Sequence, residues 1–157
     1  MEQTNRQLLV AIHEHDGGQL APLVSEIRYR YGGGRRLQIR SALQHDEGHG
    51  SASPLLWLEG GGTPPDRWLF ENNSSRASAA AVLHVSDWDP GNWEEPLAGL
   101  GRPALVAAPK ARTLAGTAAA ILVDAISGIE SIQDPGIWLE TAHKALLDHD
   151  IPSQMFP

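Results

Sequence analysis

Short apolar runs alternate along this chain with longer segments in which apolar residues recur every three or four positions. The runs are too short for helices and are typical of strands buried in a sheet. They span residues 7–12, 55–58, 81–85 and 104–108. The longer segments have the spacing of helices that bury one face, and they span residues 20–31, 114–129 and 136–147. Strands that alternate with helices predict a mostly parallel sheet flanked by helices on both faces.

The middle of the chain, residues 33–72, lacks the helical pattern. Apolar and polar residues alternate over residues 35–43, and we expect a further short strand at Trp68 to Phe70. Alternation with a period of two is typical of a strand with one wetter face. We therefore expect a single α/β domain over residues 1–157, with an irregular or antiparallel β segment in its middle.

Composition excludes several classes of site and partner. The 157-residue chain has no cysteine, so disulfides, thiolate metal ligands and a cysteine nucleophile are excluded. Its net charge of -7 argues against nucleic acid as a partner, because such binding relies on attraction to phosphates. The first residues lack the pattern of a secretion signal, and the longest apolar stretch contains Asp124. We expect a soluble cytoplasmic protein without a membrane span.

Histidines and acids follow two of the predicted strands. These candidate metal ligands are His13, His15 and Asp16 at the end of the first strand, and His84, Asp87 and Asp89 at the end of the run 81–85. If the two strands are neighbours, their carboxyl ends bring the six residues to one crevice, where they would hold a divalent metal and leave a carboxylate as general base. The alternative is that they are polar loop residues, with the aspartates bonded to their own turns.

A basic segment surrounds three consecutive glycines. Arg35 and Arg36 follow residues 32–34, where backbone amides and guanidinium groups together would suit a phosphate-containing ligand. The glycines follow a predicted helix, whereas the glycines of a dinucleotide-binding loop precede one. Arginines at a helix C-terminus also have a purely structural use, because they offset the helix dipole.

Five tryptophans are many for a chain of this length. Four of them are candidate interface residues, because exposed tryptophan is enriched at binding surfaces: Trp57, Trp68, Trp88 and Trp93. The segment 114–129 is apolar on more than one face, as expected if a second element or subunit covers it.

These observations leave three functions open. The first is an accessory or regulatory module that binds a protein partner or self-associates, since interaction surfaces require only exposed aromatics and charge asymmetry. The second is a divalent-metal-dependent hydrolase built on the histidines and aspartates. The third is binding of a phosphate-containing small ligand at the glycine and arginine segment. The chain contains no nucleophile elbow, kinase signature or dinucleotide signature.

Overall fold

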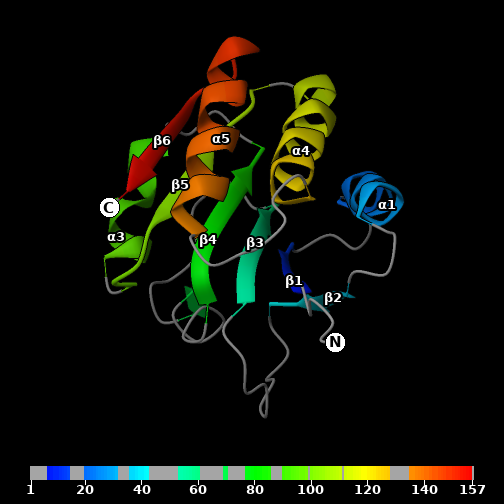
Figure 1. Ribbon diagram of the computed structural model, residues 1–157, viewed down its shortest axis with the longest axis horizontal. Helices are drawn as coiled ribbons and strands as arrows, with labels where there is room; N and C mark the ends of the chain where they lie inside the picture. Colours follow the sequence, from blue (N-terminus) through cyan, green and yellow to red (C-terminus); the bar gives the residue numbers. More distant parts are fainter. Residues whose placement is uncertain are drawn as a thin grey trace, which may run out of the picture.

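A computed structural model describes the chain over ten ranges: residues 7–14, 20–31, 36–42, 53–60, 69–70, 77–85, 90–98, 100–110, 112–127 and 135–156. The described strands form one six-stranded sheet in the order β2-β1-β3-β4-β5-β6. They are β1 (Gln7–His13), β2 (Arg36–Ser41), β3 (Ser53–Glu59), β4 (Ala77–His84), β5 (Ala104–Ala107) and β6 (Ser153–Phe156). The predicted α/β fold is therefore confirmed (Figure 1).

Strands β1 to β5 are parallel, and β6 pairs antiparallel with β5. The antiparallel pair thus lies at one edge of the sheet, whereas β2 and β3, from the middle of the chain, both run parallel to β1. Two helices, residues 112–127 and 135–148, separate β5 from β6 along the chain. At the carboxyl end of β5 the amide of Ala108 donates to the carbonyl of Pro152, and β6 runs back along β5.

The three longer helices cover one face of the sheet (Figure 1). They are α1 (Ala21–Arg30), α4 (Arg112–Ser127) and α5 (Pro135–Asp148). Helix α4 lies between α1 and α5 and contacts both. Its apolar character on more than one side is therefore explained by neighbours within this chain. None of the helices in the described ranges has the length and apolar character that a membrane span needs.

The opposite face is covered by a short 3-10 helix η1 (Pro90–Trp93), the helix α3 (Glu94–Leu97) and Phe70. Leu69 and Phe70 are helical, so the short strand expected at Trp68 to Phe70 is wrong. Phe70 contributes its ring to the core instead of a strand to the sheet.

An aromatic cluster fills the core on this second face. The ring of Trp57 lies 5.0 Å from that of Phe70 and 6.4 Å from that of Trp93, measured between centroids. All three side chains are fully buried. The expected exposure of Trp57 and Trp93 at an interface is therefore wrong, because the covering segments close over this face of the sheet. Trp68 and Trp88 lie outside the described residues.

Candidate functional site

Three polar side chains end three adjacent strands at the carboxyl edge of the sheet. His13 of β1 is paired in register with Glu59 of β3, and Glu59 is paired with His84 of β4. Residues paired across neighbouring strands point to the same face, so these side chains form one row. The preceding row on this face is Ala11, Trp57 and Val82, which are all buried.

The imidazole of His13 is bound to the carboxylate of Glu59. His13 Nδ1 lies 2.9 Å from Glu59 Oε1 and 2.9 Å from Oε2. Glu59 is 0% exposed and His13 9% exposed. When Nδ1 donates its hydrogen to the carboxylate, His13 can accept a proton only at Nε2.

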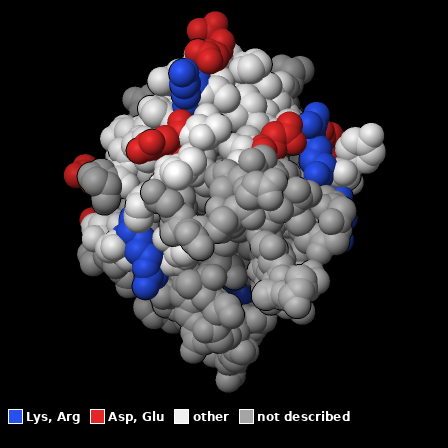
Figure 2. Space-filling view, viewed as in Figure 1, with Lys and Arg blue, Asp and Glu red and all other residues white. Residues whose placement is uncertain are grey.

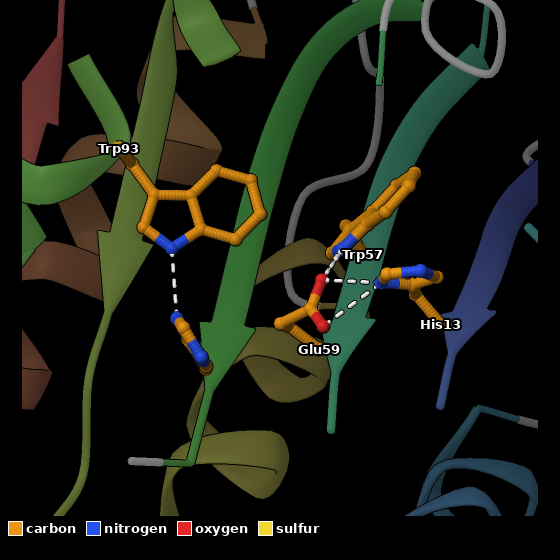
Figure 3. Close-up of polar contacts among 5 residues, drawn as sticks. His13, Trp57, Glu59 and Trp93 are labelled. Atoms are coloured by element: carbon orange, nitrogen blue, oxygen red, sulfur yellow. Dashed lines mark hydrogen bonds and ion pairs between the residues drawn. The ribbon is translucent and has the colours of Figure 1, made fainter. Parts of the chain in front are cut away.

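Glu59 accepts a second hydrogen bond from within the core. Trp57 Nε1 donates to Glu59 Oε1 at 2.9 Å. Trp57 and Glu59 are two positions apart on one strand, so both side chains project from the same face (Figure 3). The carboxylate is thus held by two N–H donors, and the buried aromatic cluster holds the indole that supplies one of them.

His84 is held at the other end of the row by Trp93. Trp93 Nε1 donates to His84 Nδ1 at 2.9 Å, and the two rings meet edge to face with their centroids 5.8 Å apart (Figure 3). An indole N–H has no acceptor capacity, so Nδ1 of His84 carries a lone pair in this contact. The neutral imidazole then has its hydrogen on Nε2.

The row lies at the point where the strand order reverses. From β1 the chain crosses through α1 to β2 on one side, whereas β3 and β4 follow on the other side of β1. Open α/β sheets bind ligands outside the carboxyl ends of their strands at such a switch point. The row of His13, Glu59 and His84 therefore occupies the place in the fold where a ligand site is expected.

The backbone around the row is also fixed. The amide of Gly60 donates to the carbonyl of His13 at 2.8 Å, so the pairing of β1 with β3 continues one residue past Glu59. Glu14 Oε1 accepts the amide of Leu20 at 3.0 Å, which ties the end of β1 to the start of α1. Both contacts restrain the two strand ends that carry His13 and Glu59.

The predicted metal ligands are brought together only in part. His13 and His84 share one face, but β3 lies between their strands, so the condition that these two strands are neighbours is not met. His15, Asp16, Asp87 and Asp89 lie outside the described residues. Among the residues that the structure describes, no group of three histidines or acids is arranged to hold a metal ion.

Arg30, in the helix before the three glycines, has structural partners. Arg30 Nη1 donates to Asp124 Oδ2 at 2.8 Å, and Arg30 also pairs with Glu26, one turn earlier in α1. The hydrogen bond with Glu26 is the largest cause of a raised Arg30 pKa, and the charge of Asp124 adds to it. Arg36 begins the edge strand β2, and Arg35 lies outside the described residues.

Charge on the visible surface is mixed. On the face shown in Figure 2, the basic side chains of the described residues are scattered, and several lie beside acidic ones. On this face, the described residues form no continuous basic stripe of the kind that binds nucleic acid.

Glu59 is the site residue that the sequence reasoning missed. The sequence contained a signal for Glu59, because it is the first charged residue after the apolar run 55–58. His13 was selected on the same pattern, a polar residue directly after an apolar run, and the pattern applies equally to an acid. A comparison of the chain with known protein families, curated proteins and solved structures found no match in any of the three.

Proposed function

We propose that this protein is an enzyme in which His13, oriented by Glu59, takes a proton from a small molecule bound at the carboxyl edge of the sheet. The contact of His13 Nδ1 with both carboxylate oxygens of a fully buried Glu59 carries the proposal. A carboxylate bound to one imidazole nitrogen fixes the ring and makes the other nitrogen the basic one, as in hydrolytic triads.

The chemistry follows from the bonding of the pair. Nε2 of His13 accepts a proton from a substrate hydroxyl, a water molecule or an activated carbon. The positive charge that forms on the ring is stabilised by Glu59, which lies in a core of low polarity where Coulomb interactions are stronger than in water. Trp57 keeps Glu59 in place as the charge develops, because its N–H is bound to Oε1.

A general base of this kind contributes about 10²–10⁴-fold to a rate. We expect the parent protein to hydrolyse p-nitrophenyl acetate, an activated ester that reports on basic imidazole. His13→Gln should lower that rate by about 10²-fold or more, and its side-chain amide can still donate to Glu59, so the fold should be kept. Glu59→Gln should lower the rate as well, because the neutral amide cannot stabilise an imidazolium.

His149→Gln is the matched control. His149 lies on the surface beyond α5, where its Nδ1 donates to the carbonyl of Ala145. Its substitution should leave the rate unchanged. An ester hydrolysis rate that is equal in the parent and in His13→Gln would refute the proposal.

The functions expected from the sequence stay predictions. Two of the four tryptophans that suggested a protein-binding surface, Trp57 and Trp93, are buried in the core. Phosphate binding would depend on Arg35 and on the side chain of Arg36, and neither of these is among the parts of the chain that the structure describes. Light scattering tests self-association directly. A melting scan with zinc, manganese and magnesium tests the metal-dependent hydrolase, since a metal that binds the folded state raises the midpoint.

A further inference from the structure

A serine and a histidine form a hydrogen bond at the β6 edge of the sheet, outside the row described above. His143 Nδ1 of α5 lies 2.8 Å from Ser153 Oγ of β6. Ser153 is paired in register with Ala107, whose side chain lies on the face that the long helices cover, so Ser153 points toward α5. Helix α5 packs beside β6 (Figure 1). Both residues of the pair are partly exposed.

The chemistry of the pair is that of a nucleophile and its base. A neutral imidazole has one nitrogen with a lone pair, which is a stronger acceptor than a hydroxyl oxygen, so the Ser153 hydroxyl donates to His143 Nδ1. A serine hydroxyl within hydrogen-bond reach of such a nitrogen gives up its proton as the oxygen attacks. In the part of the chain that the structure describes, neither side chain makes a second hydrogen bond that competes with this one.

The backbone of Ser153 supplies a further donor. In an antiparallel pair, residues whose N–H and C=O bond to the partner strand alternate with residues whose groups point away from it. The carbonyl of Pro152 accepts the amide of Ala108 of the β5 side, so the amide of Ser153 points away from β5. Strand β6 is the last in the order of described strands. The Ser153 N–H is therefore directed to the open side of β6, next to its own hydroxyl.

An exposed apolar side chain lies beside the pair. Leu147 follows His143 by one turn of α5, so the two residues share one side of the helix. Leu147 is 51% exposed and is one of three large hydrophobic side chains that the described residues expose. An alkyl chain attached to Ser153 would cover Leu147 and remove apolar surface from water.

We propose that Ser153 is a nucleophile that takes an apolar acyl group from an activated ester, with His143 as its base. Ser153 Oγ bonds to the acyl carbon while its proton passes to His143 Nδ1. The bond from the acyl carbon to the leaving oxygen then breaks, and the leaving group takes the proton from His143. The Ser153 N–H donates to the carbonyl oxygen as negative charge develops there, as the amide of the nucleophilic serine does in serine proteases.

The acyl group stays on Ser153 after the transfer. Glu59 holds His13, whereas no carboxylate among the described residues is bound to His143. Loss of the carboxylate from a serine triad lowers turnover by about 10⁴-fold. An activated ester also has a better leaving group than the serine ester that it forms, so transfer is faster than release. The site is thus separate from the proposed function of His13 and adds one equivalent of product, not a steady rate.

Phenylmethanesulfonyl fluoride tests the nucleophile, because it forms a stable sulfonyl ester with reactive serines and releases fluoride. Mass spectrometry of the digested protein should find the adduct on Ser153. His143→Gln should slow its formation by about 10²-fold or more, since the amide can bond to the hydroxyl but cannot take its proton. His149→Gln is the matched control and should leave the rate unchanged.

Ser25 is the internal control in the same digest. It lies on the exposed side of α1, without a histidine partner in the described part of the chain. Labelling of Ser25 reports exposure alone, so it should be far slower than labelling of Ser153. Because this comparison is made within the parent protein, it does not depend on whether a variant folds.

The acyl class is tested with p-nitrophenyl octanoate and p-nitrophenyl acetate. After an acid quench, mass spectrometry should show that the octanoyl adduct on Ser153 forms several-fold faster than the acetyl adduct. Leu147→Asn should remove this preference, because the alkyl chain loses its apolar contact. Thermal melts of the variants should match the parent, since these side chains are partly or largely exposed.

The outcomes separate this inference from the general base. Absence of an adduct on Ser153, labelling of Ser25 at the same rate, or an unchanged rate in His143→Gln overturns the nucleophile. Equal rates for the two esters overturn the apolar class of acyl group and leave the nucleophile intact. His13→Gln should form the Ser153 adduct at the parental rate, so failure of the proposal for His13 leaves this result unaffected.

Discussion

At the scale of single residues, the central fact is a carboxylate without solvent contact. A buried charge is costly, and removal of its partner usually destabilises a protein by about 3–5 kcal/mol. Glu59 is retained in the core by two N–H donors, from His13 and Trp57. Such an arrangement favours a defined geometry over maximum stability, which is typical of a site that has to hold a functional group in one orientation.

Trp57→Phe should cost more stability than Trp138→Phe. Both substitutions remove an indole N–H from a fully buried tryptophan and reduce the volume of the side chain by the same amount. Trp57 donates to a carboxylate and Trp138 to the carbonyl of Leu122. Hydrogen bonds to charged groups contribute about 1.5–3 kcal/mol and neutral ones about 0.5–1.5 kcal/mol. Urea denaturation of the two variants measures the difference, and equal losses would indicate that Glu59 is not ionised.

At the scale of elements, the backbone of Gly60 lies close to the side chains of Leu20 and Glu14, and this contact helps to position His13 and Glu59. A Cβ on Gly60 would lie 3.3 Å from Leu20 Cγ and 3.3 Å from Glu14 Cβ, which is tighter than ordinary contact. The strand that carries Glu59 therefore passes directly against the start of α1. The absence of a side chain at position 60 allows the end of β1, the end of β3 and the N-terminus of α1 to meet.

Two glycine substitutions should have opposite effects on stability. Gly116 lies inside α4, where an added Cβ has no heavy atom within 4 Å. Gly116→Ala should stabilise the protein by up to about 1 kcal/mol, because alanine is the better helix former. Gly60→Ala should lower the stability and the ester hydrolysis rate together, since Leu20 and Glu14 have to move. Thermal melts and rates of both variants check this, and a stabilised Gly60→Ala would show that the approach is loose.

At the scale of the whole molecule, the two ends of the sheet differ. Strand β2 forms one edge, and β6 closes the other by pairing antiparallel with β5. The four buried residues of β5 thus have a neighbour on each side. An unpaired hydrophobic strand is a template for association with other chains, so β6 protects β5 from such contacts.

Removal of residues 153–157 should destabilise the protein by roughly 2–4 kcal/mol. Met155 and Phe156 are partly buried against the two cores, and a fully buried side chain of this size contributes about 1.5–3 kcal/mol. The truncated chain should also associate, because β5 becomes an edge. Urea denaturation and light scattering measure the two effects, and a truncated chain that stays monomeric with unchanged stability would contradict this role of β6.

The sequence by itself determined most of the longer elements, because the periods of two and 3.6 residues are local properties of a strand and a helix. It predicted the five strands β1 to β5 and the three long helices, and it marked His13 and His84 as residues at strand ends. The short strand at Trp68 to Phe70 was wrong, and β6 was missed. Over three or four residues, tertiary contacts outweigh local preference.

Only the tertiary structure decided which strands are neighbours and which face each segment covers. Strand order depends on pairing between residues far apart in the chain, and no local pattern encodes it. That order places β3 between β1 and β4, so Glu59 is the hydrogen-bond partner of His13. The Nδ1 of His84 accepts its hydrogen bond from Trp93 instead. Burial of Trp57 and Trp93 has the same origin, because alternation along a strand shows that its two faces differ and does not show what packs on each.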